Sequence, residues 1–346
     1  MGDQKMMVTG RIFRYITIVG VCCIVFVCGC PQPEQPETAG ASGVLKSGAV
    51  RIAIKPTVGQ QSAYRITEQK RRNIKWEGPV PEKAAFEESF NEEKVEMVVT
   101  QRIQSVDPNG KTVAKVTFDS LKYDGIVKNV TTVDFDSSRE SDKSNVLNKL
   151  LGKSYMIEFG PDNTIIRVTD LDILRQMFSG YNPDDRAAKS ILLSDAVAER
   201  HSMLFLPQTG DKPIKPGGTW SKIKTFSFGL MGIKSYEKIY RIKEVRNVAG
   251  HQIAIIEMNA IPSAEVEDKF RSQQEAGSFP KMFDTNDLYV GGGEIDLTTG
   301  AIKKYSENLH SGWMAALPSN PGQGDPNEPV VLRMTAIREY SLEMIQ

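Results

Sequence analysis

The sequence predicts an α+β fold of mostly long antiparallel strands, in one curved sheet or two, with two central helices packed on one face. Val330 to Met344 alternates apolar and polar residues over its length, as a half-buried strand does. Paired strand-like runs elsewhere are separated by turn residues, and a helical stretch lies between them. With 346 residues, 40% of them hydrophobic, the chain can bury one large core or two ordinary ones.

The first 29 residues differ from the rest and are expected to be a signal peptide. Lys5, Arg11 and Arg14 precede an apolar run from Tyr15 to Val27 that falls short of the about 20 residues a spanning helix needs. The following Val27-Cys28-Gly29-Cys30 resembles the lipobox of bacterial lipoproteins. That resemblance implies that Cys30 is lipidated, by palmitate among other chains, and begins the mature protein.

The alternatives for this region are a short transmembrane anchor or a cluster of buried cysteines. The length of the apolar run argues against the anchor. All four cysteines, Cys22, Cys23, Cys28 and Cys30, precede the rest of the chain, so no disulfide framework is expected after them.

Residues 30–48 are expected to form a flexible tether, because they are rich in Pro, Glu and Gly and show no apolar period. By analogy with the enterobacterial sorting rule, Pro31 after the lipidated cysteine implies an outer-membrane anchor facing the periplasm. A β-rich half is predicted at 49–168, a helical segment at 169–206 and a second β-rich half at 207–346.

In the first half, two strand pairs are predicted. Residues 95–104 and 114–118 flank Asp107-Pro108-Asn109-Gly110, which has typical turn chemistry. Residues 155–159 and 165–168 flank another Gly- and Pro-containing turn.

In the helical segment, Thr169-Asp170-Leu171-Asp172 is interpreted as a capping box that opens a short helix. Asn182-Pro183-Asp184-Asp185 favours the start of a second helix, whose apolar stripe includes Leu193, Val197 and His201 and which Pro207 ends.

The second half repeats the layout of the first. Residues 236–248 and 251–261 are predicted to pair around Ala249-Gly250, and residues 293–297 and 301–305 around a second turn. This suggests a diverged internal duplication, with the generic likeness of hairpins as the alternative.

Catalytic motifs are weak. His201, His251 and His310 lack metal-ligand spacing, so core or surface roles are expected. Ser235 to Lys238 and Ser278 to Lys281 match S-x-x-K, but a strand and a proline respectively argue against an acyl-enzyme site. We therefore expect no enzyme activity, no catalytic residues, no cofactor and no metal.

Two further motifs have ordinary interpretations. Gly291-Gly292-Gly293 precedes a strand rather than a helix, which favours a bulge or tight turn over a phosphate loop. Asp134, Asp136, Ser138, Glu140 and Asp142 alternate as calcium ligands do, but Arg139 replaces the loop glycine, so a solvated acidic loop is favoured.

Residues 206–220 resemble the Leu-Pro, Pro-Val and Gly-Asp-x-Trp stretch of uncharacterised bacterial lipoproteins, many from planctomycetes, with Gly218 in place of the Asp. The predicted architecture also resembles the half-barrels of lipoprotein carriers, in which helices plug an apolar cleft.

The predicted function is that of an envelope lipoprotein, lipid-anchored in the membrane, which binds an apolar ligand or lipid, or a partner protein. A structural or assembly role in the envelope is the alternative, and a hydrolase with dispersed residues is a third possibility. The 43 basic and 43 acidic residues balance, so no nucleic-acid partner is expected.

Overall fold

The computed structural model describes residues 43–44, 48–78, 86–202, 204, 206–207, 213–273, 282–317 and 330–345. The chain divides into two units, residues 1–41 and residues 42–346, and every element below belongs to the second. The predicted signal peptide, Cys30 and most of the tether lie outside the described residues, as do Ser278 and Lys281.

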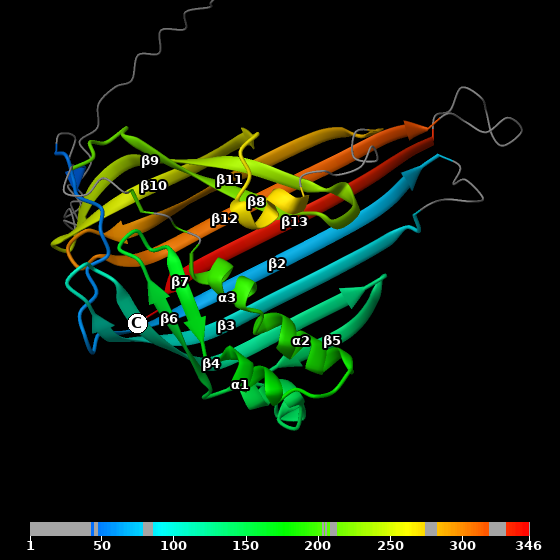
Figure 1. The fold of residues 1–346 in the computed structure, drawn as a ribbon, viewed down its shortest axis with the longest axis horizontal. Coiled ribbons are helices and arrows are strands. Elements are labelled where there is room, and N and C mark those ends of the chain that lie inside the picture. The colour runs from blue at the N-terminus through cyan, green and yellow to red at the C-terminus, as the bar shows by residue number, and fades with distance from the viewer. Residues whose placement is uncertain are drawn as a thin grey trace, which may run out of the picture. The chain divides into compact units, whose positions relative to one another are not determined.

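Within the described ranges, thirteen strands form one antiparallel sheet (Figure 1). They are β1 (Gly43–Val44), β2 (Gln61–Glu77), β3 (Ser89–Val106), β4 (Thr112–Val127), β5 (Val130–Asp136), β6 (Ser154–Phe159), β7 (Ile165–Thr169), β8 (Thr219–Ser227), β9 (Ile233–Val248), β10 (His251–Ser263), β11 (Asp284–Asp296), β12 (Ala301–Leu317) and β13 (Val330–Met344). The order is β1-β9-β10-β11-β12-β13-β2-β3-β4-β6-β7, with β5 paired to β4 and β8 paired to β9.

The two β-rich parts of the chain make a single sheet rather than two. The last strand, β13, pairs with the first long strand, β2, along almost its whole length, from Val331 opposite Glu77 to Met344 opposite Tyr64. This pairing joins β2–β4 to β9–β13. Each group is a meander of sequence neighbours, so most strand pairs need only a short turn.

Turn residues end the strands where the sequence predicts. Asp107 accepts backbone hydrogen bonds from Asn109 and Lys111 between β3 and β4, with Gly110 at φ 82°. Ala249 and Gly250 join β9 to β10 with positive φ at both positions. The interpretation of Gly291–Gly293 as a tight turn is wrong, because these residues lie inside β11. The register shift in this region falls one residue later, at Glu294/Ile295.

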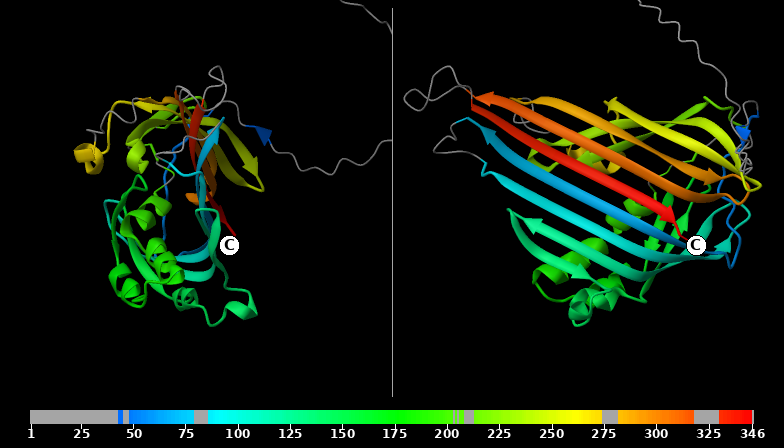
Figure 2. Two further views of the ribbon diagram at one scale, coloured as in Figure 1. Left: turned by 90° about the vertical axis from the view of Figure 1, so that its right-hand side faces the viewer. Right: turned by 180° about the vertical axis from the view of Figure 1, so that it is seen from behind.

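Three short α-helices lie on the concave side of the sheet: α1 (Leu171–Gln176), α2 (Pro183–Ile191) and α3 (Ser194–His201) (Figures 1 and 2). Asn182 caps α2 as predicted, since its side chain accepts a hydrogen bond from the Asp185 amide. The predicted capping box at Asp170 is wrong. Asp170 adopts a left-handed conformation, with φ 70°, and its side chain makes no capping bond.

The predicted second helix is broken in two. Leu193 is extended and half exposed, whereas its neighbour Leu192 is completely buried. A continuous helix with Leu193 on its buried stripe would not bury Leu192 in this way, so the axis changes direction between α2 and α3. The latter ends at His201, before Pro207.

The core lies between the concave face of the sheet and these helices. On β2 the buried Ile66 and Trp76 share one parity, and on β3 Val95, Met97 and Val99 do the same. From the helices, Leu174, Ala188, Ile191 and Val197 complete the packing. Because apolar side chains fill the space beneath the helices, the position of each helix depends on the sheet under it.

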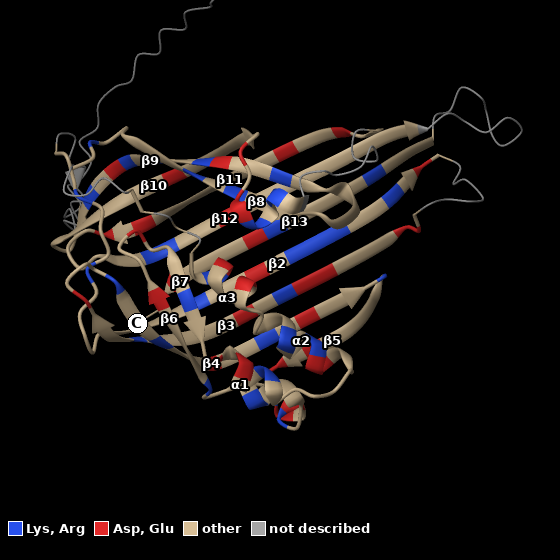
Figure 3. Ribbon diagram, viewed as in Figure 1, with Lys and Arg blue, Asp and Glu red and all other residues tan. Residues whose placement is uncertain are grey.

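The convex face is polar and carries cross-strand ion pairs. Arg65 pairs with Glu343 across β2 and β13, and Arg333 pairs with Glu77 across the same strands. Figure 3 shows acidic and basic positions distributed over the long strands. Exposed pairs of this kind contribute little stability, about 0–1 kcal/mol each, but their charges favour a surface in contact with water.

Candidate functional site

A groove of about 690 Å³ opens on the concave side of the sheet. Strands β2 to β5 and β13 contribute to its lining, helix α2 forms one wall, and Phe228 reaches it from the connection between β8 and β9. Its volume is in the range of small-molecule sites, about 300–1,000 Å³. The groove is therefore the candidate ligand site of the described chain.

The groove has apolar surface. Tyr123, Val133, Ala187, Phe228 and Ala336 line it, and each of them is at least nine-tenths buried. They come from four strands or connections and one helix, and side chains of the core support them from behind. The apolar part of the groove is therefore preformed.

The groove also carries charge. Lys70, Arg71, Arg72, Arg186 and Arg338 line it, against only Glu92 and Glu93 among the acids. Figure 3 shows the basic positions on β2 and on α2. Glu93 accepts a hydrogen bond of 3.4 Å from Ser190 on α2. In a chain with equal numbers of acidic and basic residues, this is a local excess of positive charge.

A narrow pit of about 40 Å³ adjoins the groove, and Lys70 and Arg338 line both. The guanidinium of Arg338 lies over the rings of Phe226 and Phe228, at 4.9 and 5.7 Å from their centroids. Glu199 of α3 also lines the pit. Burial alone would raise the pKa of Glu199, but the charges of Lys224, Arg338 and Lys70 lower it, so the carboxylate stays ionised.

A buried polar cluster reaches the bottom of the pit. Lys238 of β9 and Glu307 of β12 form an ion pair with side chains 1% and 5% exposed. The hydroxyls of Tyr289 and Tyr305 also donate to the carboxylate of Glu307. Burial lowers the pKa of Lys238, but the Glu307 carboxylate outweighs it, so the pKa is raised and the ammonium stays charged. Tyr289 and Glu307 of this cluster line the pit.

Helix α3 is fixed to the sheet by a second buried pair. Arg200 donates to Glu68 of β2 through Nε at 2.8 Å, and its guanidinium side chain is 1% exposed. The hydroxyl of Tyr340 on β13 donates to the backbone carbonyl of Arg200 at 2.6 Å. Since α3 forms part of the pit, these bonds position one of its walls.

His201, the next residue, is buried as the sequence predicts for a core histidine. Its Nε2 lies 2.8 Å from the hydroxyl of Tyr155 on β6. Burial, with the nearby charge of Arg200, lowers the pKa of His201 to about 3. His201 is therefore neutral in the folded protein over the physiological range.

This burial predicts a pH dependence of stability. In the unfolded chain the pKa of a histidine is about 6.5, so below that pH the unfolded state takes up a proton that the folded state does not. The free energy of unfolding should fall as pH drops from 6.5 to 5, by up to about 1.4 kcal/mol per pH unit. Urea unfolding of the wild-type protein and a His201→Gln variant across this range measures the contribution. Equal slopes in the two proteins would contradict it.

The other sequence candidates do not gather at the groove. Nδ1 of His251, at the start of β10, lies 2.9 Å from the buried Asp296 at the end of β11. His310 is half buried on β12. In the part of the chain that the structure describes, none of the three histidines hydrogen-bonds a serine. Ser235 bonds Thr225 at 2.8 Å, and Lys238 belongs to the cluster described above.

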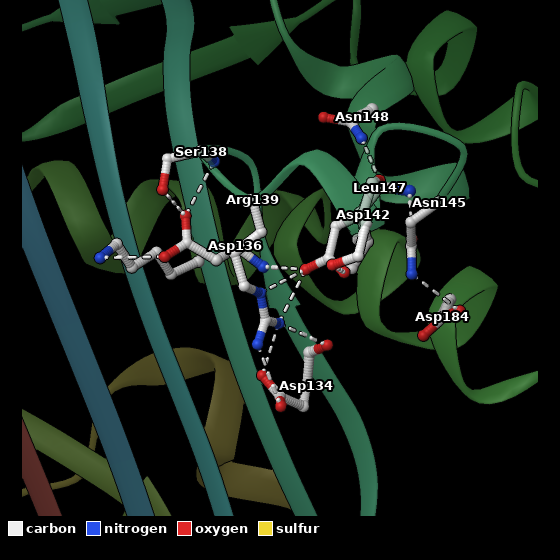
Figure 4. A network of polar contacts seen from close by, with 11 residues as sticks. Asp134, Asp136, Ser138, Arg139, Asp142, Asn145, Leu147, Asn148 and Asp184 are labelled. Atoms are coloured by element: carbon white, nitrogen blue, oxygen red, sulfur yellow. Dashed lines mark hydrogen bonds and ion pairs between the residues drawn. The ribbon is translucent and has the colours of Figure 1, made fainter.

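The acidic motif at 134–142 is an arginine-centred network (Figure 4). Arg139 donates to Asp134 and to Asp142, while Asp136 accepts from Ser138. Among the described residues no group of three or more His, Cys, Asp or Glu side chains has a geometry that would hold a metal ion. The guanidinium of Arg139 supplies the positive charge that Asp134 and Asp142 face.

The glycines of β11 and the 206–220 segment have structural explanations. A Cβ on Gly293 would lie 2.6 Å from the carbonyl oxygen of Lys304, so close strand approach requires glycine there. A Cβ on Gly218 would lie 2.5 Å from Ile214, which leaves no room for the Asp of the resembled pattern. The Trp220 ring stacks on Tyr240 at 5.5 Å and packs against the core, as predicted.

The basic residues of the groove are not among the site residues predicted from the sequence. Two of them, Lys70 and Arg72, fall with the acidic Glu68 between Ile66 and Ile74 on the core-facing parity of β2. Arg338 similarly follows Ala336 on β13. Charged residues at core-facing positions of a long strand are unusual, because burying them is costly. These charged residues, which interrupt the apolar face of the strand, were the feature of the sequence that could have indicated the groove.

Comparisons with known proteins leave the family open. No protein-family model and no curated sequence matches the chain. A solved structure entitled "Lipid-protein interactions in lipovitellin" aligns with 84% of this chain at 10% identity and a TM-score of 0.35, and the match spans 25% of the lipovitellin chain. OpdL of Pseudomonas aeruginosa (9% identity, TM-score 0.19) aligns over 83% of this chain and 99% of its own. DynF from the dynemicin biosynthesis pathway of Micromonospora chersina, at 9% identity and a TM-score of 0.16, aligns with 90% of this chain and 92% of its own. These scores are low, so the geometry must carry the functional inference.

Within the described ranges, no helix is long and apolar enough to cross a membrane.

Proposed function

We propose that this chain is a non-enzymatic, membrane-anchored envelope lipoprotein that binds an amphipathic ligand of lipid type in the concave groove. The observation that carries the proposal is the composition of the groove, in which preformed apolar surface lies beside an excess of basic side chains. A purely apolar ligand would leave Arg72 and Arg186 of this groove without a partner, whereas an amphipathic one would use both surfaces.

The proposed anchor is Cys30, in the sequence context described above. The tether after it would let the binding unit of residues 42–346 stand away from the membrane surface. The neighbouring Pro31 supports an outer-membrane location facing the periplasm.

The absence of enzyme activity is part of the proposal. In the described groove, the Ser190 hydroxyl lies 3.4 Å from Glu93, and His201 of the neighbouring core is bonded to Tyr155. The Ser190 hydroxyl donates at 2.8 Å to the carbonyl oxygen of Ala187, and no histidine lines the described groove to activate that hydroxyl as a nucleophile.

The alternative, a structural or assembly role, would be favoured by an exposed apolar patch on the sheet. The convex face instead carries ion pairs such as Arg65–Glu343 and Arg333–Glu77. This favours a solvated surface over a large assembly interface.

Mass spectrometry of the full chain tests both parts of the proposal. The protein is produced with its own leader in a bacterial host that lipidates exported cysteines, and purified from membranes in non-ionic detergent. The denatured protein should begin at Cys30 with added acyl mass, and Cys30→Ala should abolish this. The native protein should carry a lipid-sized adduct that is lost on unfolding.

A pair of serine variants locates the adduct. Ser190→Trp places a large ring in the groove, whereas Ser194→Trp places the same ring on the exposed start of α3. We expect adduct occupancy to fall several-fold in the first variant and to stay unchanged in the second. A wild-type protein without any adduct would argue against ligand binding, and an adduct equally present in both variants would place it elsewhere.

A further inference from the structure

The basic residues of the groove differ in whether other groups of the protein already neutralise their charge. Arg71 forms an ion pair of 2.9 Å with Glu339 and also bonds Gln69. Lys70 and Arg338 face the ionised Glu199, whose pKa both of them lower. Arg338 also stacks on Phe226. These three side chains are therefore at least partly neutralised by the fold.

Arg72 and Arg186 are not neutralised by protein groups in this way. Within the described chain, neither side chain hydrogen-bonds a protein group or forms an ion pair with a carboxylate, although both line the groove. Arg72 comes from the core-facing parity of β2 and Arg186 from the exposed side of α2, so two separate elements bring guanidinium groups to one groove.

Neither acid of the groove forms an ion pair with Arg72 or Arg186 among the described residues. Glu93 is bonded to Ser190, and the charge of Glu93 adds to burial in raising the pKa of Tyr123. Glu92 accepts a hydrogen bond from Gln69. The groove thus holds two unpartnered guanidinium groups next to apolar surface from Tyr123, Ala187 and Phe228.

We propose that Arg72 and Arg186 bind the anionic headgroup of the ligand, so that the protein selects phosphate- or carboxylate-bearing amphiphiles over zwitterionic or neutral ones. This inference rests on the proposed function. A guanidinium donates two parallel hydrogen bonds to a phosphate or carboxylate, and such charge-assisted pairs are stronger than neutral ones. The aliphatic part of the ligand would lie against the apolar residues of the groove.

Calorimetry on the full chain, held in nanodiscs of phosphatidylcholine, tests the selection. The probes are dihexanoylphosphatidic acid, dihexanoylphosphatidylcholine and inorganic phosphate, with empty nanodiscs as the blank. We expect phosphatidic acid to bind at least about tenfold more tightly than either of the other probes. Raising the salt from about 0.01 M to about 1 M should weaken this binding, because the Debye length falls from about 30 to about 3 Å.

The variants isolate the two arginines. Arg72→Gln with Arg186→Gln should weaken the binding of phosphatidic acid about tenfold and remove its advantage over phosphatidylcholine. The control is Lys75→Gln with Arg102→Gln. It removes the same charge from exposed positions of β2 and β3 outside the groove and should change neither affinity.

The outcomes are distinguishable. Equal binding of both lipids, unchanged in the arginine variant, would overturn the headgroup site and leave the proposed function standing. Binding of neither lipid would overturn the proposed function as well. If inorganic phosphate bound as tightly as phosphatidic acid and depended on the arginines, the anion site would be supported and the amphipathic ligand overturned.

Discussion

Replacing Glu307 by alanine should lower the free energy of unfolding by about 3–5 kcal/mol, because it leaves a buried ammonium without its carboxylate. Lys238 is 1% exposed, so water does not replace the lost partner. The substitution also removes the acceptor of the Tyr289 and Tyr305 hydroxyls. Urea unfolding measured by circular dichroism gives the value.

Two control variants test this explanation. Glu77→Ala breaks the exposed pair with Arg333, in which both side chains are 47% exposed, and should cost about 0–1 kcal/mol. Replacing both partners, as Lys238→Met with Glu307→Leu, should cost clearly less than Glu307→Ala because no buried charge is left alone. If the double variant were as unstable as the single one, lost packing rather than an uncompensated charge would explain the effect.

Replacing Arg200 by leucine should have the next largest effect, about 3 kcal/mol, at the lower end of the range for buried pairs. Glu68 is 12% exposed, so some water reaches its carboxylate after the change. Because Arg200 is the link between α3 and β2, the helix should loosen while the β9–β12 region stays ordered. Hydrogen exchange should therefore rise in residues 194–201 and remain unchanged in β12.

The matched control is Arg175→Leu in α1. Arg175 pairs with Asp172, whose side chain is 81% exposed, and its loss should cost less than about 1 kcal/mol. Uniform exchange throughout the Arg200→Leu protein would mean that the unit unfolds as a whole, and that Arg200 does not act through α3.

Much of the sheet was predictable from local sequence. The alternation in Val330–Met344 matches β13, and the Asp107–Gly110 and Ala249–Gly250 turns join the strands expected on either side. These features depend on residues close together in the chain, where the strand period and turn chemistry act directly. The internal duplication and the lipidation of Cys30 stay predictions.

The helices were less predictable. The start at Asn182 followed from its capping chemistry, whereas the break after α2 did not, because burial of Leu192 rather than Leu193 depends on the sheet beneath. The capping box at Asp170 failed for a related reason, since the chain enters α1 from β7 through a left-handed residue.

The sequence by itself determined the alternation of β13 and the turns at Asp107–Gly110 and Ala249–Gly250, because strand period and turn chemistry act locally. Only the tertiary structure decided that β13 pairs with β2 to make one sheet, and that Arg72 and Arg186, far apart in sequence, line one groove. It also decided that Lys238 meets Glu307 and that Arg200 meets Glu68. Partner choice among distant charged residues depends on sheet order and helix direction, which no local pattern encodes.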